Sequence, residues 1–96
     1  MSIYAVTYLY ADDTALKDQH RPEHREFLGA LHAEGTLLAS GPYTDEDGGA
    51  LLILQGEGTA AEVLSVLDPD PFRREGVVLE RSIRPWNVVI GGFGTA

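Results

Sequence analysis

The alternation of hydrophobic and polar positions predicts a strand at the start of the chain. Residues 3–10 are rich in β-branched and aromatic side chains and end at the acidic turn Asp12-Asp13, a pattern typical of a strand. Both alternating faces of this segment are apolar, one with Ile3, Ala5 and Leu9 and the other with Tyr4, Val6, Tyr8 and Tyr10. We therefore expect this strand to be covered on both sides.

Helical periodicity follows the first strand. Phe27, Leu28 and Leu31 recur at helical spacing, and Gly35 predicts the end of the helix. Pro22 predicts the start, because a proline in the first turn removes an N–H that has no partner in the helix. On this interpretation His20 precedes the regular helix.

The rest of the chain predicts a hairpin, a second helix and a last strand. Residues 37–40 and 50–55 flank the acidic turn 45–49, and Gly41-Pro42 stops the first of these strands because proline cannot donate to a continuing ladder.

Thr59 and Glu62 match a capping box that opens a helix running to about residue 67. The proline-dense segment 68–72 and a short helical turn come next. A strand over residues 77–86 places Val77, Leu79, Arg81 and Ile83 on one face, and the tail from Gly91 is expected to fray.

The resulting order β-α-β-β-α-β predicts an α+β fold of the ferredoxin-like type, with an antiparallel sheet and both helices on one face. The other face of the sheet stays open. Because residues 3–10 and 50–55 are apolar on both faces, a single copy would expose an apolar patch that a second copy could cover sheet to sheet. We expect one domain over residues 1–96 that forms a homodimer.

Composition narrows the function classes. The chain has 96 residues with 15 acidic and 7 basic side chains, a formal charge of -8 that argues against a nucleic-acid partner. An anionic substrate would need local arginines. The absence of cysteine excludes disulfides and thiolate nucleophiles. The first ten residues are apolar but short and lack a basic leader, so we expect neither a signal peptide nor a membrane span and take the cytoplasm as the default location.

Two short motifs suggest chemistry, Arg21-Pro22-Glu23-His24 and Asp70-Pro71-Phe72. They offer an imidazole and a carboxylate from separate elements, the minimum for proton transfer. His24 shares a helix face with Leu28 and points toward the sheet, where it could equally be a hydrogen-bonded core residue. Asp70 could equally be a turn or cap residue.

Other catalytic interpretations have less support. Ser40 could be the nucleophile of a Ser-His-Asp hydrolase, but no nucleophile elbow surrounds it. His20 and His24 have the spacing of two metal ligands on one helix face, with His32 as a third, but Pro22 is expected to place His20 before the helix. We therefore expect no metal and no cofactor.

Two arginines and two aromatic residues are further candidates for substrate binding. Arg21 and Arg84 could anchor a carboxylate or phenolate, or could form surface or interface ion pairs instead. Phe72 and Trp86 could wall a pocket or belong to the core, because pockets and cores use the same residue types.

Four segments in order, 21–28, 35–42, 70–72 and 83–86, together resemble the YciI-like family, also called the YCII-related domain. The resemblance implies a dimeric α+β barrel of ferredoxin-like subunits with an active-site dyad at His24 and Asp70. The biochemistry of the family is mostly unassigned. One branch dehydrochlorinates chlorinated hydroxyquinol-type aromatics, and the wider superfamily includes muconolactone isomerases and small monooxygenases.

Together with these residues, the resemblance implies a small cofactor-independent enzyme, of the lyase, isomerase or dehydrochlorinase type, that acts on a small organic anion. His24 is the expected general base and acid, and Asp70 orients it. The expected substrate-binding residues are Arg21, Ser40, Gly41, Pro42 and Phe72. The alternative is a module of the same fold that binds a small ligand or a protein without turnover.

Overall fold

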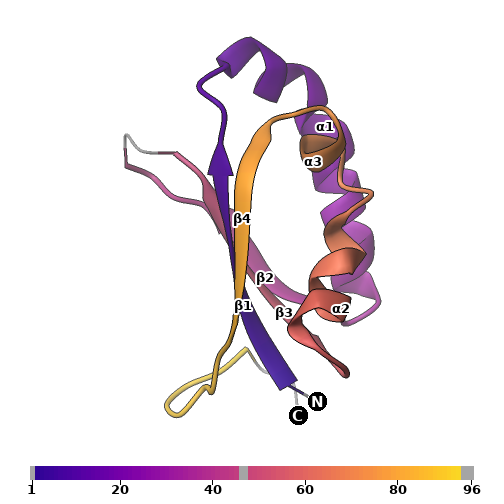
Figure 1. Cartoon of the computed structure of the whole chain (residues 1–96), viewed down its shortest axis with the longest axis vertical. Coiled ribbons are helices and arrows are strands. Elements are labelled where there is room, and N and C mark those ends of the chain that lie inside the picture. Colours follow the sequence, from indigo (N-terminus) through magenta and orange to yellow (C-terminus); the bar gives the residue numbers. More distant parts are fainter. Residues whose placement is uncertain (1, 46–47, 94–96) are drawn as a thin grey trace.

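The computed structural model describes residues 2–45 and 48–93. Its elements in chain order are β1 (Ser2–Tyr10), α1 (Thr14–Ala33), β2 (Leu37–Pro42), β3 (Ala50–Gly56), α2 (Ala60–Leu64), the 3-10 turn η1 (Ser65–Leu67), α3 (Pro71–Arg74) and β4 (Val78–Pro85). The four strands form one antiparallel sheet in the order β2-β3-β1-β4. The helices cover one face of this sheet and leave the other open (Figure 1). The predicted ferredoxin-like α+β fold is confirmed.

The core lies between the sheet and the helices. In the pairing of β1 with β3, Tyr4 is opposite Leu54 and Val6 is opposite Leu52, and all four side chains are buried. Leu28 of α1 packs against this layer. Burial of a large apolar side chain typically contributes about 1.5–3 kcal/mol, so these contacts fix where α1 lies over the sheet.

Helix α1 begins much earlier than Pro22. It starts at Thr14, and the Asp13 side chain caps it by accepting a hydrogen bond of 3.0 Å from the Leu16 N–H. Pro22 lies inside the helix with an exposed side chain. The predicted start was wrong because the cap at Asp13 supplies a local N-terminal signal, and the helix tolerates the proline on its solvent side. His20 therefore lies within the helix.

Strand β2 also passes its predicted end. Pro42 pairs with Ala50, so Gly41-Pro42 does not stop the strand. Because β2 is an edge strand, the missing proline N–H leaves no ladder bond unmade. Of the predicted acidic turn, residues 46 and 47 lie outside the described residues. Gly49 returns the chain to the sheet with φ 99°, and a Cβ there would lie only 2.3 Å from the Tyr8 carbonyl oxygen.

A register shift alters the predicted alternation of β4. The shift falls between Leu9 and Tyr10 of β1, where Tyr10 pairs with Val78. Val77 and Val78 are consequently both buried, whereas Leu79 is 60% exposed. The expectation that Leu79 shares a face with Arg81 was therefore wrong, because a bulge interrupts strict alternation.

Residues 86–93, which follow β4, have no regular secondary structure. The Trp86 N–H still donates to the Ile3 carbonyl at 2.8 Å, and the Trp86 ring meets Phe93 edge to face at 6.1 Å between centroids. The predicted frayed tail falls partly on residues 94–96, which lie outside the described residues. None of the described helices is long and apolar enough to cross a membrane.

Candidate active site

Helix α1 brings one histidine down to the sheet. His24 and Leu28 are four residues apart, and both are buried on the helix face that packs against the core. His24 is only 8% exposed. The predicted orientation of this side chain is confirmed.

Asp70 lies in the turn between η1 and α3. It is the N-cap of α3, and its Oδ1 accepts a hydrogen bond of 3.0 Å from the Phe72 N–H. Pro71 occupies the first turn of α3, where proline is favoured. The cap interpretation is thus correct, yet Asp70 is also fully buried, which is unusual for an aspartate without further partners.

Those partners come from two distant elements. The Asp70 Oδ1 lies 2.7 Å from the His24 Nδ1, and the Tyr8 hydroxyl donates to the Asp70 Oδ2 at 3.1 Å. With the Phe72 N–H, three donors converge on one carboxylate, an arrangement that suits its ionised form. Because an ionised carboxylate only accepts, the His24 Nδ1 must carry the proton, and in the neutral ring Nε2 holds the lone pair.

Aromatic contacts fix the orientation of the imidazole. The Phe72 ring stacks on His24 with 3.8 Å between centroids and 4° between planes. The Tyr10 ring packs edge to face against the Phe72 ring, with 5.5 Å between centroids and 89° between planes. The His24 ring is therefore held on one face by Phe72 and along one edge by Asp70.

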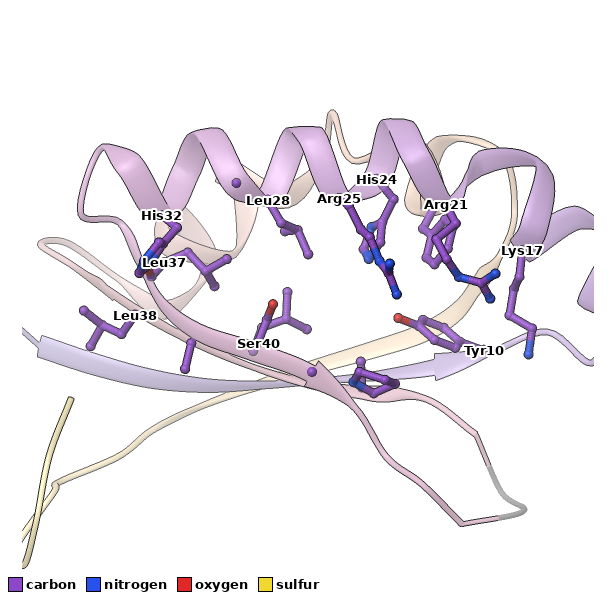
Figure 2. A pocket seen from close by; sticks show the side chains of 17 residues that line it. Tyr10, Lys17, Arg21, His24, Arg25, Leu28, His32, Leu37, Leu38 and Ser40 are labelled. Carbon is purple, nitrogen blue, oxygen red and sulfur yellow. The ribbon is translucent and has the colours of Figure 1, made fainter.

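A cavity of about 850 Å³ opens beside His24, between α1 and β2 (Figure 2). This volume lies within the range of small-molecule sites. Apolar side chains line part of it, notably Leu28, Leu37 and Leu52. Its charged lining residues are Lys17, Arg21 and Arg25, and none of the aspartates and glutamates that the structure describes lines it. The cavity is thus locally positive in a chain of formal charge -8.

The predicted site residues mostly meet here. Arg21, Ser40, Gly41, Pro42 and Phe72 all line the cavity together with His24. Asp70 does not line it and holds His24 from behind. Among the described residues the His24 ring hydrogen-bonds only to Asp70, so the nucleophile pairing considered for Ser40 is not formed.

Arg84 and Trp86 lie outside the cavity beside His24. Arg84 pairs with Ala5 in the sheet and does not line the cavity, so of its two interpretations the structure does not support the substrate anchor. Trp86 is 43% exposed and belongs neither to the core nor to the cavity wall. The alternation of β4 with β1 places Arg84 and Ala5 on the sheet face opposite Tyr4 and Val6.

Sequence reasoning missed Tyr8, Tyr10, Lys17 and Arg25. Tyr8 and Tyr10 were placed on the correct face of β1, but their proximity to Asp70 depends on a contact between distant parts of the chain. Lys17 and Arg25 follow a visible signal, the four-residue spacing 17, 21, 25 on one helix. Because the predicted helix began at Pro22, Lys17 and Arg21 lay outside it and the helical spacing was not recognised.

The two tyrosines remain neutral phenols. Burial, followed by the nearby Asp70 carboxylate, raises the pKa of Tyr8 well above its ordinary value. Burial and Asp70 together raise the pKa of Tyr10 to about 12. Both hydroxyls therefore keep their protons at neutral pH and can donate.

The earlier start of α1 does not support a metal site at His20, His24 and His32. His20 now lies one turn before His24 in α1, but it does not line the cavity. Within residues 2–45 and 48–93, no three His, Cys, Asp or Glu side chains gather as a metal site would need.

The fold and the site define a ferredoxin-like α+β protein with a buried His-Asp pair beside a small-molecule cavity. The model of the YCII-related domain family matches residues 3–87, and the chain belongs to this family. A solved structure with the same fold is the 5-chloro-2-hydroxyhydroquinone dehydrochlorinase (TftG) of Burkholderia phenoliruptrix AC1100, in complex with 2,5-dihydroxybenzoquinone. It is 21% identical, with a TM-score of 0.73 over 88% of this chain and 93% of that one. No curated protein matches the sequence.

Proposed function

We propose that the protein is a small enzyme that uses the His24–Asp70 pair for general acid–base chemistry on a small organic anion, without a cofactor. The reaction type is a lyase, isomerase or dehydrochlorinase step, in which a proton leaves one carbon and either returns elsewhere or accompanies a leaving group. The observation that carries this proposal is the 2.7 Å contact between the His24 Nδ1 and the Asp70 Oδ1, on a histidine that lines the cavity.

His24 would act first as a base. Its Nε2 would take a proton from substrate carbon while Nδ1 stays bonded to Asp70, and the carboxylate would stabilise the imidazolium that forms. The imidazolium would then give the proton back, to another carbon or to a departing group. Acid–base catalysis by one positioned side chain is typically worth about 10²–10⁴-fold.

The remaining lining residues supply binding. Arg21 contributes positive charge, and Ser40, Gly41 and Pro42 form the β2 wall of the cavity. Phe72 offers a ring face and at the same time holds His24. The locally positive lining supports an anionic substrate, because it opposes the overall charge of the chain.

The similar fold of a dehydrochlorinase supports small-molecule chemistry as the class of function. That protein was solved with a dihydroxybenzoquinone, a planar six-membered ring. A planar ligand suits a cavity whose wall includes the Phe72 ring, so hydroxylated and halogenated aromatic anions are the first compounds to test.

Turnover assays on wild-type protein and on His24→Gln test this proposal. A panel of chlorinated hydroxyquinols and lactone acids would be followed by ultraviolet absorbance and by chloride release. We expect at least one compound to turn over, with a loss of about 10²–10⁴-fold in His24→Gln. Undiminished turnover in that variant would refute the acid–base role. Binding of compounds without any turnover would favour the ligand-binding module instead.

A further inference from the structure

Three cations form a row on the cavity side of α1. Lys17, Arg21 and Arg25 are spaced by four residues, so they lie along one face of the helix. All three line the cavity, and Figure 2 shows their side chains directed toward the sheet on the same side as His24. The row therefore forms part of the cavity wall, with Arg25 at its solvent-exposed edge.

The members of this row differ in their partners. Arg21 forms an ion pair with Asp18, one turn earlier in α1. The Lys17 ammonium lies over the Tyr10 ring, 5.8 Å from its centroid. Arg25 forms no ion pair with any residue that the structure describes. Arg25 is thus the guanidinium whose charge is still available to a ligand.

Beyond this row the cavity has an apolar part next to Arg25. Leu28 lies within a turn of Arg25 on α1, and Leu37 and Leu52 face it from the sheet. The Tyr10 hydroxyl also points into the cavity and forms no hydrogen bond with another described residue (Figure 2). A ligand that matches this wall has an acidic group at one end and an apolar body.

We propose that the substrate is a carboxylic acid with an apolar body, and that Arg25 is its principal anchor, assisted by Lys17 and Tyr10. This inference rests on the proposed function, because it assigns the substrate class of the same cavity. Guanidinium groups bind carboxylates through two parallel hydrogen bonds, which fixes the orientation of the acid as well as its position. Arg25 and His24 line the same cavity, so an acid bound to Arg25 has its apolar body in the space that the imidazole also lines.

Binding of benzoate and of its neutral isostere benzamide tests the inference. Dissociation constants would be measured by NMR titration on wild-type protein, Arg25→Gln, Arg25→Lys and Arg21→Gln. We expect benzoate to bind more tightly than benzamide, and Arg25→Gln to weaken benzoate by about tenfold. Benzamide should be unaffected. Arg25→Lys should lose less than Arg25→Gln, and added salt should weaken benzoate binding alone.

Several results would overturn the inference. They are equal affinity for benzoate and benzamide, an Arg25→Gln variant that binds benzoate like wild type, a larger loss in Arg21→Gln, or no benzoate binding at all. Circular dichroism would verify that each variant is folded. A wrong acid–base role for His24 would give a different set of results. Benzoate binding would still depend on Arg25, whereas turnover would survive in His24→Gln.

Discussion

The Asp70 carboxylate joins three parts of the chain through three hydrogen bonds, to His24, Tyr8 and the Phe72 N–H. The sequence suggested Asp70 either as a helix cap or as the partner of His24, and the structure shows that it is both. The cap could be predicted because it depends on neighbours two residues apart. The Tyr8 contact could not, because it spans 62 positions and depends on how α3 lies over β1.

Replacing Tyr8 with phenylalanine removes one donor from this carboxylate. We expect the free energy of unfolding to fall by about 1–2 kcal/mol, because the Asp70 Oδ2 is left buried without its partner. Loss of that bond should also change the His24 ring signals in NMR spectra. Urea denaturation and ¹H–¹⁵N spectra of the imidazole measure the two effects.

Tyr4→Phe provides the matched control. The Tyr4 hydroxyl donates to the Gly58 carbonyl at 3.1 Å, far from Asp70 in the hydrogen-bond network. This variant should lose some stability and leave the His24 signals in place. If both variants leave those signals unchanged, Tyr8 does not position the dyad.

Helix α1 is the element on which sequence and structure differ most. Its apolar stripe over Phe27, Leu28 and Leu31 was predicted correctly, because the 3.6-residue period is a strong signal. Its start was not, since Pro22 is a more conspicuous signal than the cap at Asp13. That error affected the functional prediction. With Lys17 outside the predicted helix, the row of Lys17, Arg21 and Arg25 on one helix face could not be recognised. Strand β4 was misjudged for a similar reason, as a bulge leaves no clear mark in a sequence.

Asp13→Ala tests the true start of α1. Loss of the hydrogen bond to the Leu16 N–H should lower the free energy of unfolding by about 0.5–2 kcal/mol, the usual value for a capping residue. Asp12→Ala is the control, because Asp12 is exposed and does not cap the helix. Equal unfolding midpoints for the two variants in urea would contradict a start at Thr14.

At the scale of the whole molecule, the sheet leaves one face without a helical cover (Figure 1). Both Leu9 and Leu51 alternate with core residues in their strands and are exposed. Ile53, on the same side of β3 as Leu51, is also apolar but is already buried in the single chain. A chain of this size buries only part of its apolar surface by itself, so we propose that a second copy covers this face.

Sedimentation of wild-type protein and of Leu51→Glu tests the homodimer. We expect the wild type to sediment as a dimer and the variant as a monomer, because the new carboxylate would be desolvated at the interface. Ala30→Glu, on the exposed part of α1, should stay dimeric. A monomeric wild type, or a dimer that tolerates Leu51→Glu, would contradict sheet-to-sheet packing.

The raised pKa of Tyr10 also affects the whole molecule through its stability. The folded value is about 12, against 10.0 for a free tyrosine, so the folded chain holds this proton more tightly than the unfolded chain. The resulting stability is present below pH 10 and is lost as the pH rises toward 12. Urea denaturation across this range should show a falling free energy of unfolding, with a shallower slope in Tyr10→Phe. An identical slope in the variant would contradict the assignment.

The central claim is that His24 and Asp70 act as one proton-transfer unit, and ¹H–¹⁵N NMR spectra of the His24 imidazole in wild-type protein and in Asp70→Asn test it most directly. Asparagine still caps α3, so the variant should fold. We predict that the His24 Nδ1–H signal moves upfield in Asp70→Asn, because this N–H then donates to a neutral amide rather than to a carboxylate. An unchanged Nδ1–H signal would show that the two side chains are not hydrogen-bonded and would contradict the acid–base mechanism.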